Sequence, residues 1–178
     1  MRQSKSAGAV ALTALLTALS LVILYLSVLV PTGRMGVVAV AGLLPAAAVI
    51  SGGPAAGGLC YAAASILALI LLPDKGNALL YLLFFGLYPL VKYAVERLGR
   101  LPLELVLKLA FFNVMLTVFW FGLQAIFLSA LPPAAADTAL WVLYPAGNVV
   151  FLAYDFGFSK LIAFYVVRVD QPMRRRRR

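Results

Sequence analysis

The feature that most constrains this chain is its first apolar stretch, Ala7 to Val30. It runs for twenty-four residues without a charged side chain. A helix rises about 1.5 Å per residue, so a helix of this length extends for about 36 Å and exceeds a bilayer's hydrocarbon core of about 30 Å. The stretch is too long for the apolar part of a signal peptide, and further apolar stretches follow it. It therefore predicts a retained membrane span.

Four alanines form a stripe along one face of this predicted helix. Their spacings are four, three and four residues, and the stripe consists of Ala7, Ala11, Ala14 and Ala18. Side chains at these spacings lie above one another on a helix. In lipid, helices associate where small side chains let their backbones approach. We interpret the stripe as a surface that docks a partner helix, and the alternative is an ordinary packing seam within the chain.

The composition is typical of a polytopic membrane protein. Of the 178 residues, 64% are hydrophobic and 12% are charged. Soluble domains of this size contain fewer hydrophobic and more charged residues. The sequence contains no long polar linker, so we expect one domain over residues 1–178. It has no histidine and one cysteine, Cys60, which argues against an internal disulfide, a metal centre and histidine-based catalysis. We expect no cofactor, no metal and no nucleic-acid partner.

Prolines, glycines and charged residues divide the apolar sequence into six stretches. The predicted fold is all-α, a polytopic integral membrane protein with six transmembrane helices in one bundle. The predicted spans are 7–30, 35–50, 55–72, 77–95, 103–131 and 138–167, followed by a basic tail at 168–178. The second span contains Pro45, which frees a backbone carbonyl and predicts a kink covered by neighbouring helices.

The distribution of basic residues predicts the orientation in the membrane. With six spans both termini share a side, and that side carries twelve basic residues, against only Arg34 and Lys75 on the other. The positive-inside rule then places both termini in the cytoplasm. The expected location of the chain is the cell membrane of a bacterium. Without Arg174–Arg178 the ratio is still seven to two. The arginine tail is expected to bind anionic lipid head groups, at about 1 kcal/mol per basic residue.

Asp155 is a carboxylate deep within the last predicted span. It precedes Arg168 by thirteen residues, or about 20 Å along a helix. A charged carboxylate at that depth costs several kcal/mol unless it is paired or protonated. Lys108 and Lys160 are the nearest expected partners, so we predict an intramembrane ion pair among these three residues. A functional role and a structural role, in which the pair fixes the register of the last two spans, both remain open.

Aromatic and amide side chains gather in the half of the predicted bundle that faces away from the cytoplasm. Within each span they are three or four residues apart and so share a helix face. The candidate ligand-binding residues are Asn77, Tyr81, Trp120, Gln124, Trp141, Tyr144 and Asn148. Flat apolar rings with a few orienting amides suit a small organic ligand. The alternative is that the rings mark the membrane interface and that the amides bond neighbouring helices.

The layout resembles a known family, the integral-membrane substrate-binding (S) components of energy-coupling-factor (ECF) transporters. Those proteins have six helices, cytoplasmic termini and a first helix with an Ala-xxx-Ala stripe, matched here by Ala7/Ala11 and Ala14/Ala18. A stretch rich in Gly, Pro and Ala is also typical of them and reads GLLPAAAVISGGPAAGGL from Gly42 to Leu59. The segments YPLVK (88–92) and KLAFFN (108–113) are similar to segments of uncharacterised bacterial membrane proteins.

The resemblance implies a division of labour. The outer aromatic and amide residues would bind a vitamin-like nutrient, and the alanine stripe would dock a membrane coupling subunit driven by two cytoplasmic ATPases. This chain has no Walker motif and would not hydrolyse ATP itself.

Three classes of function follow from these observations. The first is a transport subunit with a site for a small nutrient. The second is a membrane scaffold of the morphogenesis type, whose partners are other membrane proteins and which has no small-molecule substrate. The third, an intramembrane enzyme, has the least support because aspartyl catalysis usually needs two carboxylates sharing a site. We therefore expect that the chain is not an enzyme.

Overall fold

The computed structural model describes residues 2–30, 32–127 and 133–171, and their side chains in 8–30, 32–122, 141–168 and 170–171. Within these ranges the chain is helical and contains no strand, which confirms the all-α prediction. The α-helices are α1 (Arg2–Leu29), α2 (Arg34–Ala41), α3 (Leu43–Gly52), α4 (Pro54–Leu71), α5 (Lys75–Leu80), α6 (Tyr88–Glu96), α7 (Leu101–Phe127) and α8 (Pro133–Tyr165). Two π-helical segments, η1 (Tyr81–Phe85) and η2 (Val166–Asp170), complete the described elements.

Six helical stretches in the described residues are long and apolar enough to cross a membrane. They are Gly8–Leu29, Arg34–Gly52, Pro54–Leu71, Lys75–Glu96, Leu101–Gly122 and Trp141–Arg168. The number matches the prediction, and the arrangement supports a multi-pass membrane protein. Insertion into a bilayer and the cytoplasmic position of both termini remain predictions. Most of the predicted basic tail, from residue 172 onward, lies outside the described residues.

The boundaries differ most from the prediction at the last helix. We expected the last span to begin at residue 138, whereas α8 begins at Pro133. Proline suits the first turn of a helix, where its missing N–H has no helical acceptor to lose. Pro133 therefore suits the first position of α8.

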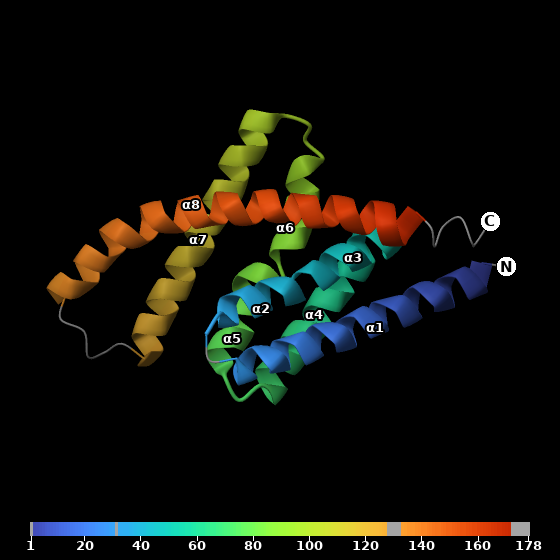
Figure 1. The fold of residues 1–178 in the computed structure, drawn as a ribbon, viewed down its shortest axis with the longest axis horizontal. Helices are drawn as coiled ribbons and strands as arrows, with labels where there is room; N and C mark the ends of the chain where they lie inside the picture. Colours follow the sequence, from blue (N-terminus) through green and yellow to red (C-terminus); the bar gives the residue numbers. More distant parts are fainter. Residues whose placement is uncertain (1, 31, 128–132, 172–178) are drawn as a thin grey trace. The chain divides into compact units, whose positions relative to one another are not determined.

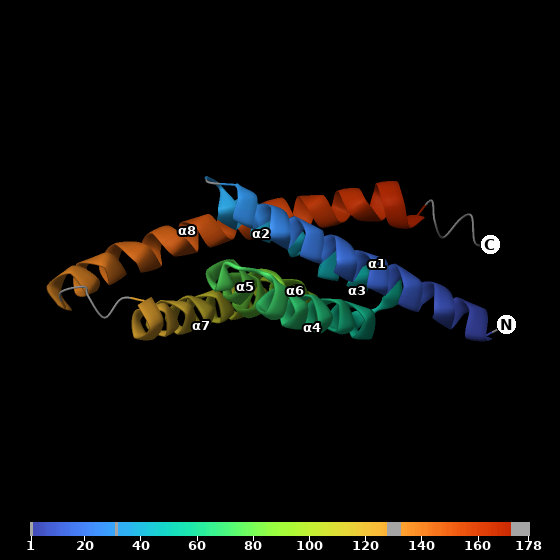
Figure 2. The ribbon, with the colours of Figure 1, turned by 90° about the horizontal axis from the view of Figure 1, so that it is seen from below.

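The chain divides into two compact units. Unit 1 comprises 1–94 together with 161–178, and unit 2 comprises 95–160. In unit 1, α1 contacts α2, α3 and α4, and it lies beside them in both views of the ribbon (Figure 1 and Figure 2). The core of unit 1 is built from small and branched apolar side chains around one tyrosine: Leu24, Val38, Ala41, Ala64, Ala68, Leu72, Ala78 and Tyr81.

Two of the spans in unit 1 are interrupted at mid-length. The second breaks between α2 and α3 at Gly42, three residues before Pro45, as the proline predicts. The fourth breaks at η1, where the Gly86 N–H donates to the Tyr81 carbonyl at 2.8 Å, a five-residue step. The two breaks pack on each other, because a Cβ placed on Gly42 would overlap the carbonyl oxygen of Phe85.

Polar contacts hold the connections that follow α1 and α4. Asp74 caps α5 by accepting from the N–H groups of Gly76, at 2.9 Å, and Asn77, at 3.4 Å. It also pairs with Arg34 at 3.4 Å. The Lys75 ammonium donates to the Leu72 carbonyl at 2.9 Å and so closes the end of α4. These contacts join the α1–α2 connection to the α4–α5 connection within unit 1.

Candidate functional site

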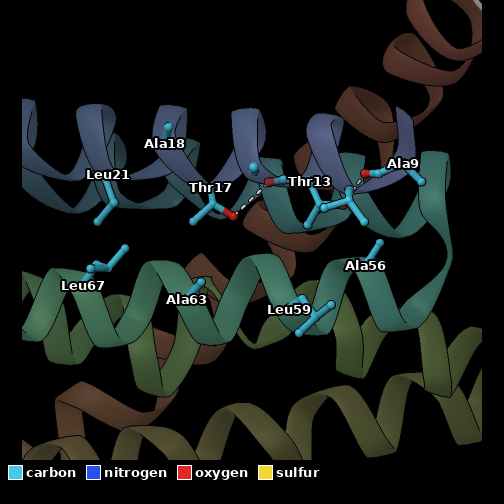
Figure 3. A pocket seen from close by; sticks show the side chains of 11 residues that line it. Ala9, Thr13, Thr17, Ala18, Leu21, Ala56, Leu59, Ala63 and Leu67 are labelled. Carbon is cyan, nitrogen blue, oxygen red and sulfur yellow. Dashed lines mark hydrogen bonds between the residues drawn. The ribbon is translucent and has the colours of Figure 1, made fainter. Parts of the chain in front are cut away.

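An apolar groove runs between α1 and α4 in unit 1. Its volume is about 520 Å³. Figure 3 shows side chains of α1 facing side chains of α4 across it. The lining residues are Ala9, Val10, Thr13, Ala14, Thr17, Ala18 and Leu21 from α1, and Ala56, Leu59, Ala63 and Leu67 from α4.

The two threonines of the groove place no unpaired hydroxyl in it. Thr13 donates to the carbonyl of Ala9 and Thr17 to the carbonyl of Thr13, both at 2.9 Å (Figure 3). Each hydroxyl is thus bonded one turn back along its own helix, a common arrangement in membrane helices. The groove therefore presents an apolar surface, and its hydroxyl groups need no hydrogen-bond partner from a docked molecule.

The predicted alanine stripe lies partly within this groove. Ala11, Ala14 and Ala18 are exposed on the surface of unit 1. Ala14 and Ala18 line the groove, whereas Ala11 does not belong to the lining. The side chain of Ala7 lies outside the described residues. Sequence reasoning overlooked the α4 side of the surface, although Ala56 and Ala63 repeat at a spacing of seven and so share a face.

Two of the predicted ligand residues belong to the interior of unit 1. Asn77 is buried, and its Nδ2 donates to the Ser27 hydroxyl at 3.0 Å. Tyr81 opens η1 and is fully buried in the core cluster. Neither side chain opens onto the α1–α4 groove.

The remaining predicted ligand residues belong to unit 2. Tyr144 is within 2.6 Å of the Thr117 hydroxyl. Asn148 and Asn113 exchange two hydrogen bonds, at 2.9 and 3.1 Å, through both amide groups. The pairs 113–148 and 117–144 run in opposite directions along the two helices, so α7 and α8 form an antiparallel hairpin.

The two tryptophans of the set make no hydrogen bond within the described residues. Trp141 is 84% exposed. The Trp120 indole nitrogen is buried and has no hydrogen-bond partner among the described residues. The side chain of Gln124 lies outside the described residues. The hairpin therefore uses the Asn148 amide and the Tyr144 hydroxyl, and it leaves the Trp141 ring exposed.

The predicted ion pair has a third member that the sequence did not suggest. The Lys108 Nζ lies 3.2 Å from Asp155 Oδ2 and 2.7 Å from Glu96 Oε1. Lys108 is 6% exposed. Lys160 lies elsewhere, with its Nζ 5.3 Å from the centre of the Phe156 ring. Glu96 is the last residue of α6 and is followed by the polar segment 97–100.

The hairpin also packs through aromatic rings. Phe112 of α7 stacks on Phe151 of α8, with ring centroids 4.7 Å apart and an interplanar angle of 10°. Gly147 leaves room for this contact, since a Cβ there would lie 3.2 Å from the Phe112 ring. Polar and aromatic contacts thus fix the register of α7 against α8.

Comparisons with known proteins add nothing to this geometry, since no protein-family model, curated protein sequence or solved structure matches the chain.

Proposed function

We propose that this chain is the substrate-binding membrane subunit of an ECF-type transporter, and that it docks its coupling subunit in the α1–α4 groove. The observation that carries the proposal is the exposed groove lined by Ala14 and Ala18 on α1 and by Ala63 on α4. Small side chains on an exposed membrane helix provide the close approach that helix association in lipid needs. The proposal rests also on the resemblance in helix number and alanine spacing described above.

The groove constrains the partner's chemistry. Its lining carries no charge, and its hydroxyl groups are bonded within α1. A charged or strongly polar segment would lose its hydration there without gaining a partner. The docked element is therefore an apolar helix whose larger side chains fill the space above the alanines.

The proposed cargo is a small vitamin-like nutrient that binds through aromatic surface. Trp120 and Trp141 support this role, because the hairpin leaves the Trp141 ring exposed and the Trp120 indole N–H without a partner among the described residues. Flat apolar rings with one or two donors are typical of sites for such ligands.

A second candidate function is a membrane scaffold without a small-molecule substrate. It is favoured by the internal hydrogen bonds of Asn77, Tyr144 and Asn148, which use the polar groups of these three predicted ligand residues within their own units. The groove serves a scaffold equally well, so the two candidates differ in cargo and in the identity of the docked partner.

The test is co-purification from the membranes of the chain's own host. The tagged chain is compared with Ala63→Leu, which fills the groove, and with Ala62→Leu, an exposed alanine of α4 outside the groove. Overfilling a packed contact costs about 1–3 kcal/mol. We therefore expect Ala63→Leu to reduce partner recovery about tenfold, the equivalent of about 1.4 kcal/mol, and Ala62→Leu to leave it unchanged.

The identity of what co-purifies separates the two candidates. A coupling subunit with ATPases, together with a vitamin-sized compound detected by mass spectrometry, supports the transporter. Recovery of other membrane proteins without ATPases or a small molecule supports the scaffold. Equal partner loss in both alanine variants contradicts docking in the groove.

A further inference from the structure

The fourth span changes its backbone hydrogen-bond pattern at one point, the segment η1. In an α-helix the Gly86 N–H would donate to the carbonyl of Leu82, four residues earlier. It donates instead to the carbonyl of Tyr81, five residues earlier, at 2.8 Å. This five-residue step encloses one residue more than an α-helical turn. The Leu82 carbonyl therefore loses its usual helical donor.

A side chain of another helix supplies the missing donor. The Tyr61 hydroxyl, on α4, donates to the Leu82 carbonyl at 2.9 Å. The Tyr61 ring packs on Gly86, where an added Cβ would lie 2.9 Å from its edge. This contact holds the ring where its hydroxyl reaches η1. Tyr61 thus takes the role that the Gly86 N–H has in an α-helix.

The Leu82 carbonyl therefore has two alternative donors, and each belongs to a different helical state of the span. With the Tyr61 hydroxyl as donor, the span keeps its five-residue step. With the Gly86 N–H as donor, the span becomes a continuous α-helix. A buried carbonyl without either donor is costly. We propose that η1 is a one-residue register switch, held in its π-helical state by the Tyr61 hydroxyl.

The switch decides which face of α6 is buried in unit 1. Tyr88 and Lys92 are buried in the π-helical state, at 0% and 3% exposure, whereas Val91 is only partly buried. Removing the extra residue of the step turns the helix that follows by about 100°, the rotation of one residue. Each residue then takes the place of the one that follows it, so Val91 occupies the position of Lys92.

The group that the switch moves is charged. In the π-helical state Lys92 lies in the interior of unit 1, and in the α-helical state it turns out of that interior. Charged side chains within membrane spans are costly and usually serve a function. π-Helical steps inside α-helices are also frequent at functional sites. The switch therefore gives the fourth span a way to expose or withdraw one ammonium group without unwinding α5.

Photolabelling with a lipid-soluble diazirine tests the switch on the native side chains of α6. The chain is labelled in bilayers, and mass spectrometry measures the ratio of label on Lys92 to label on Val91. Tyr61→Phe removes the hydroxyl that donates to Leu82, so the span changes to its α-helical state. We expect the ratio to rise several times over the wild-type value. An unchanged ratio overturns the proposal.

Tyr81→Phe is the matched control for this experiment. The Tyr81 ring also packs on Gly86, where a Cβ would lie 2.8 Å from it. Its hydroxyl is buried and has no hydrogen-bond partner among the described residues. The control should therefore leave the label ratio at its wild-type value. A similar rise in both variants would mean that loosening of the core turns α6, and it contradicts the role of the Tyr61 hydrogen bond.

Deletion of Leu83 from η1 tests the extra residue directly and does not depend on the folding of Tyr61→Phe alone. In the deletion chain the step closes to an α-helix, and the backbone supplies the donor to Leu82. Tyr61→Phe should then lower the Tm in detergent by about 2–4 °C in the full chain. In the deletion chain it should leave the Tm level or raise it. Equal falls in both chains overturn the proposal.

Deletion of Ile66 is the control for the loss of a residue. Ile66 lies within α4, and its side chain is 59% exposed, so the side chain itself contributes little to the core. No extra residue in α4 absorbs the loss, and the rest of that helix turns by about 100°. We expect this deletion to abolish folding, whereas the Leu83 deletion yields a folded chain. Equal damage from the two deletions contradicts a spare residue in η1.

Discussion

Lys108 places one ammonium group between two carboxylates inside unit 2. Its distances to Glu96 and Asp155 are 2.7 and 3.2 Å. The Asp155 side chain is 18% exposed and the Glu96 side chain 43%, so water screens the Glu96 pair more strongly. The contact with Asp155 therefore dominates the contribution of Lys108 to stability.

Lys108→Met is expected to destabilise the chain strongly, because it removes the ammonium from both carboxylates while keeping the bulk of the side chain. Breaking a buried ion pair from one side costs about 3–5 kcal/mol. Lys160→Met is the matched control, since within the described residues it removes a cation–π contact with Phe156, worth about 0.5–1 kcal/mol. Melting temperatures in detergent check the prediction, and equal shifts in the two variants contradict it.

The relation between Asp155 and its neighbours shows what sequence can and cannot supply at this scale. Because Asp155 lies deep in a predicted span, its carboxylate needs a basic partner. Lys108 and Lys160 are the two candidates that their positions in the predicted spans suggest. Lys160 follows Asp155 by five residues, which turns it about 140° around the helix at about 100° per residue. Glu96 and Lys108 are twelve residues apart, on either side of the connection between α6 and α7, so helix periodicity alone does not predict their contact.

At the level of elements, the interrupted spans of unit 1 depend on close backbone contact. Gly42 lies in right-handed helical geometry with φ −64°, so its backbone conformation is open to any residue. What it needs is the absence of a side chain, since a Cβ would overlap the Phe85 carbonyl oxygen. Backbone atoms cannot give way as a flexible side chain can.

Gly42→Ala is therefore expected to lower the free energy of unfolding by about 1–3 kcal/mol, the usual cost of overfilling a packed core. Gly36→Ala in the same span is the matched control, because a Cβ there meets nothing within 4 Å. Replacing that helical glycine by alanine should leave the free energy of unfolding unchanged or raise it by about 0.5–1 kcal/mol. Chemical denaturation in mixed micelles measures both, and a neutral Gly42→Ala contradicts the contact.

Hydropathy predicts the existence of the elements better than their internal breaks. Long apolar runs separated by Pro, Gly and charge gave six spans, and six span-length helices are present in the described residues. Pro45 predicted the break of the second span. The π-helical segment at Tyr81–Phe85 had no comparable signal, because its sequence, YLLFF, reads as ordinary helix. It forms where the Tyr61 hydroxyl bonds the Leu82 carbonyl at 2.9 Å, a contact between distant residues.

For the whole molecule, the distribution of apolar surface indicates where it resides. Large apolar side chains such as Val10, Leu15 and Leu29 on α1 are about 65% exposed. Only 17% of the first span's most apolar window is buried inside the chain, and only 6% of the fifth span's. In water, apolar faces of this extent would drive aggregation. A lipid environment accounts for them without further contacts, which supports the multi-pass assignment.

The orientation in the membrane leads to the last prediction. Met35 lies at the start of the second span, in α2, and Leu98 follows the end of the fourth span, between α6 and α7. Both side chains are exposed, at 63% and 50%. Cys60 is fully buried and is replaced by alanine to give a background without reactive thiols. If basic residues orient the chain as expected, a membrane-impermeant maleimide labels Met35→Cys in intact cells and Leu98→Cys only after permeabilisation.

The reverse pattern places both termini outside, and with them the arginine tail away from the cytoplasmic lipid head groups. Such a result would also leave the proposed coupling subunit unable to present cytoplasmic ATPases to this chain in the expected orientation. Labelling after solubilisation, where both sites must react, controls for accessibility of the thiols themselves.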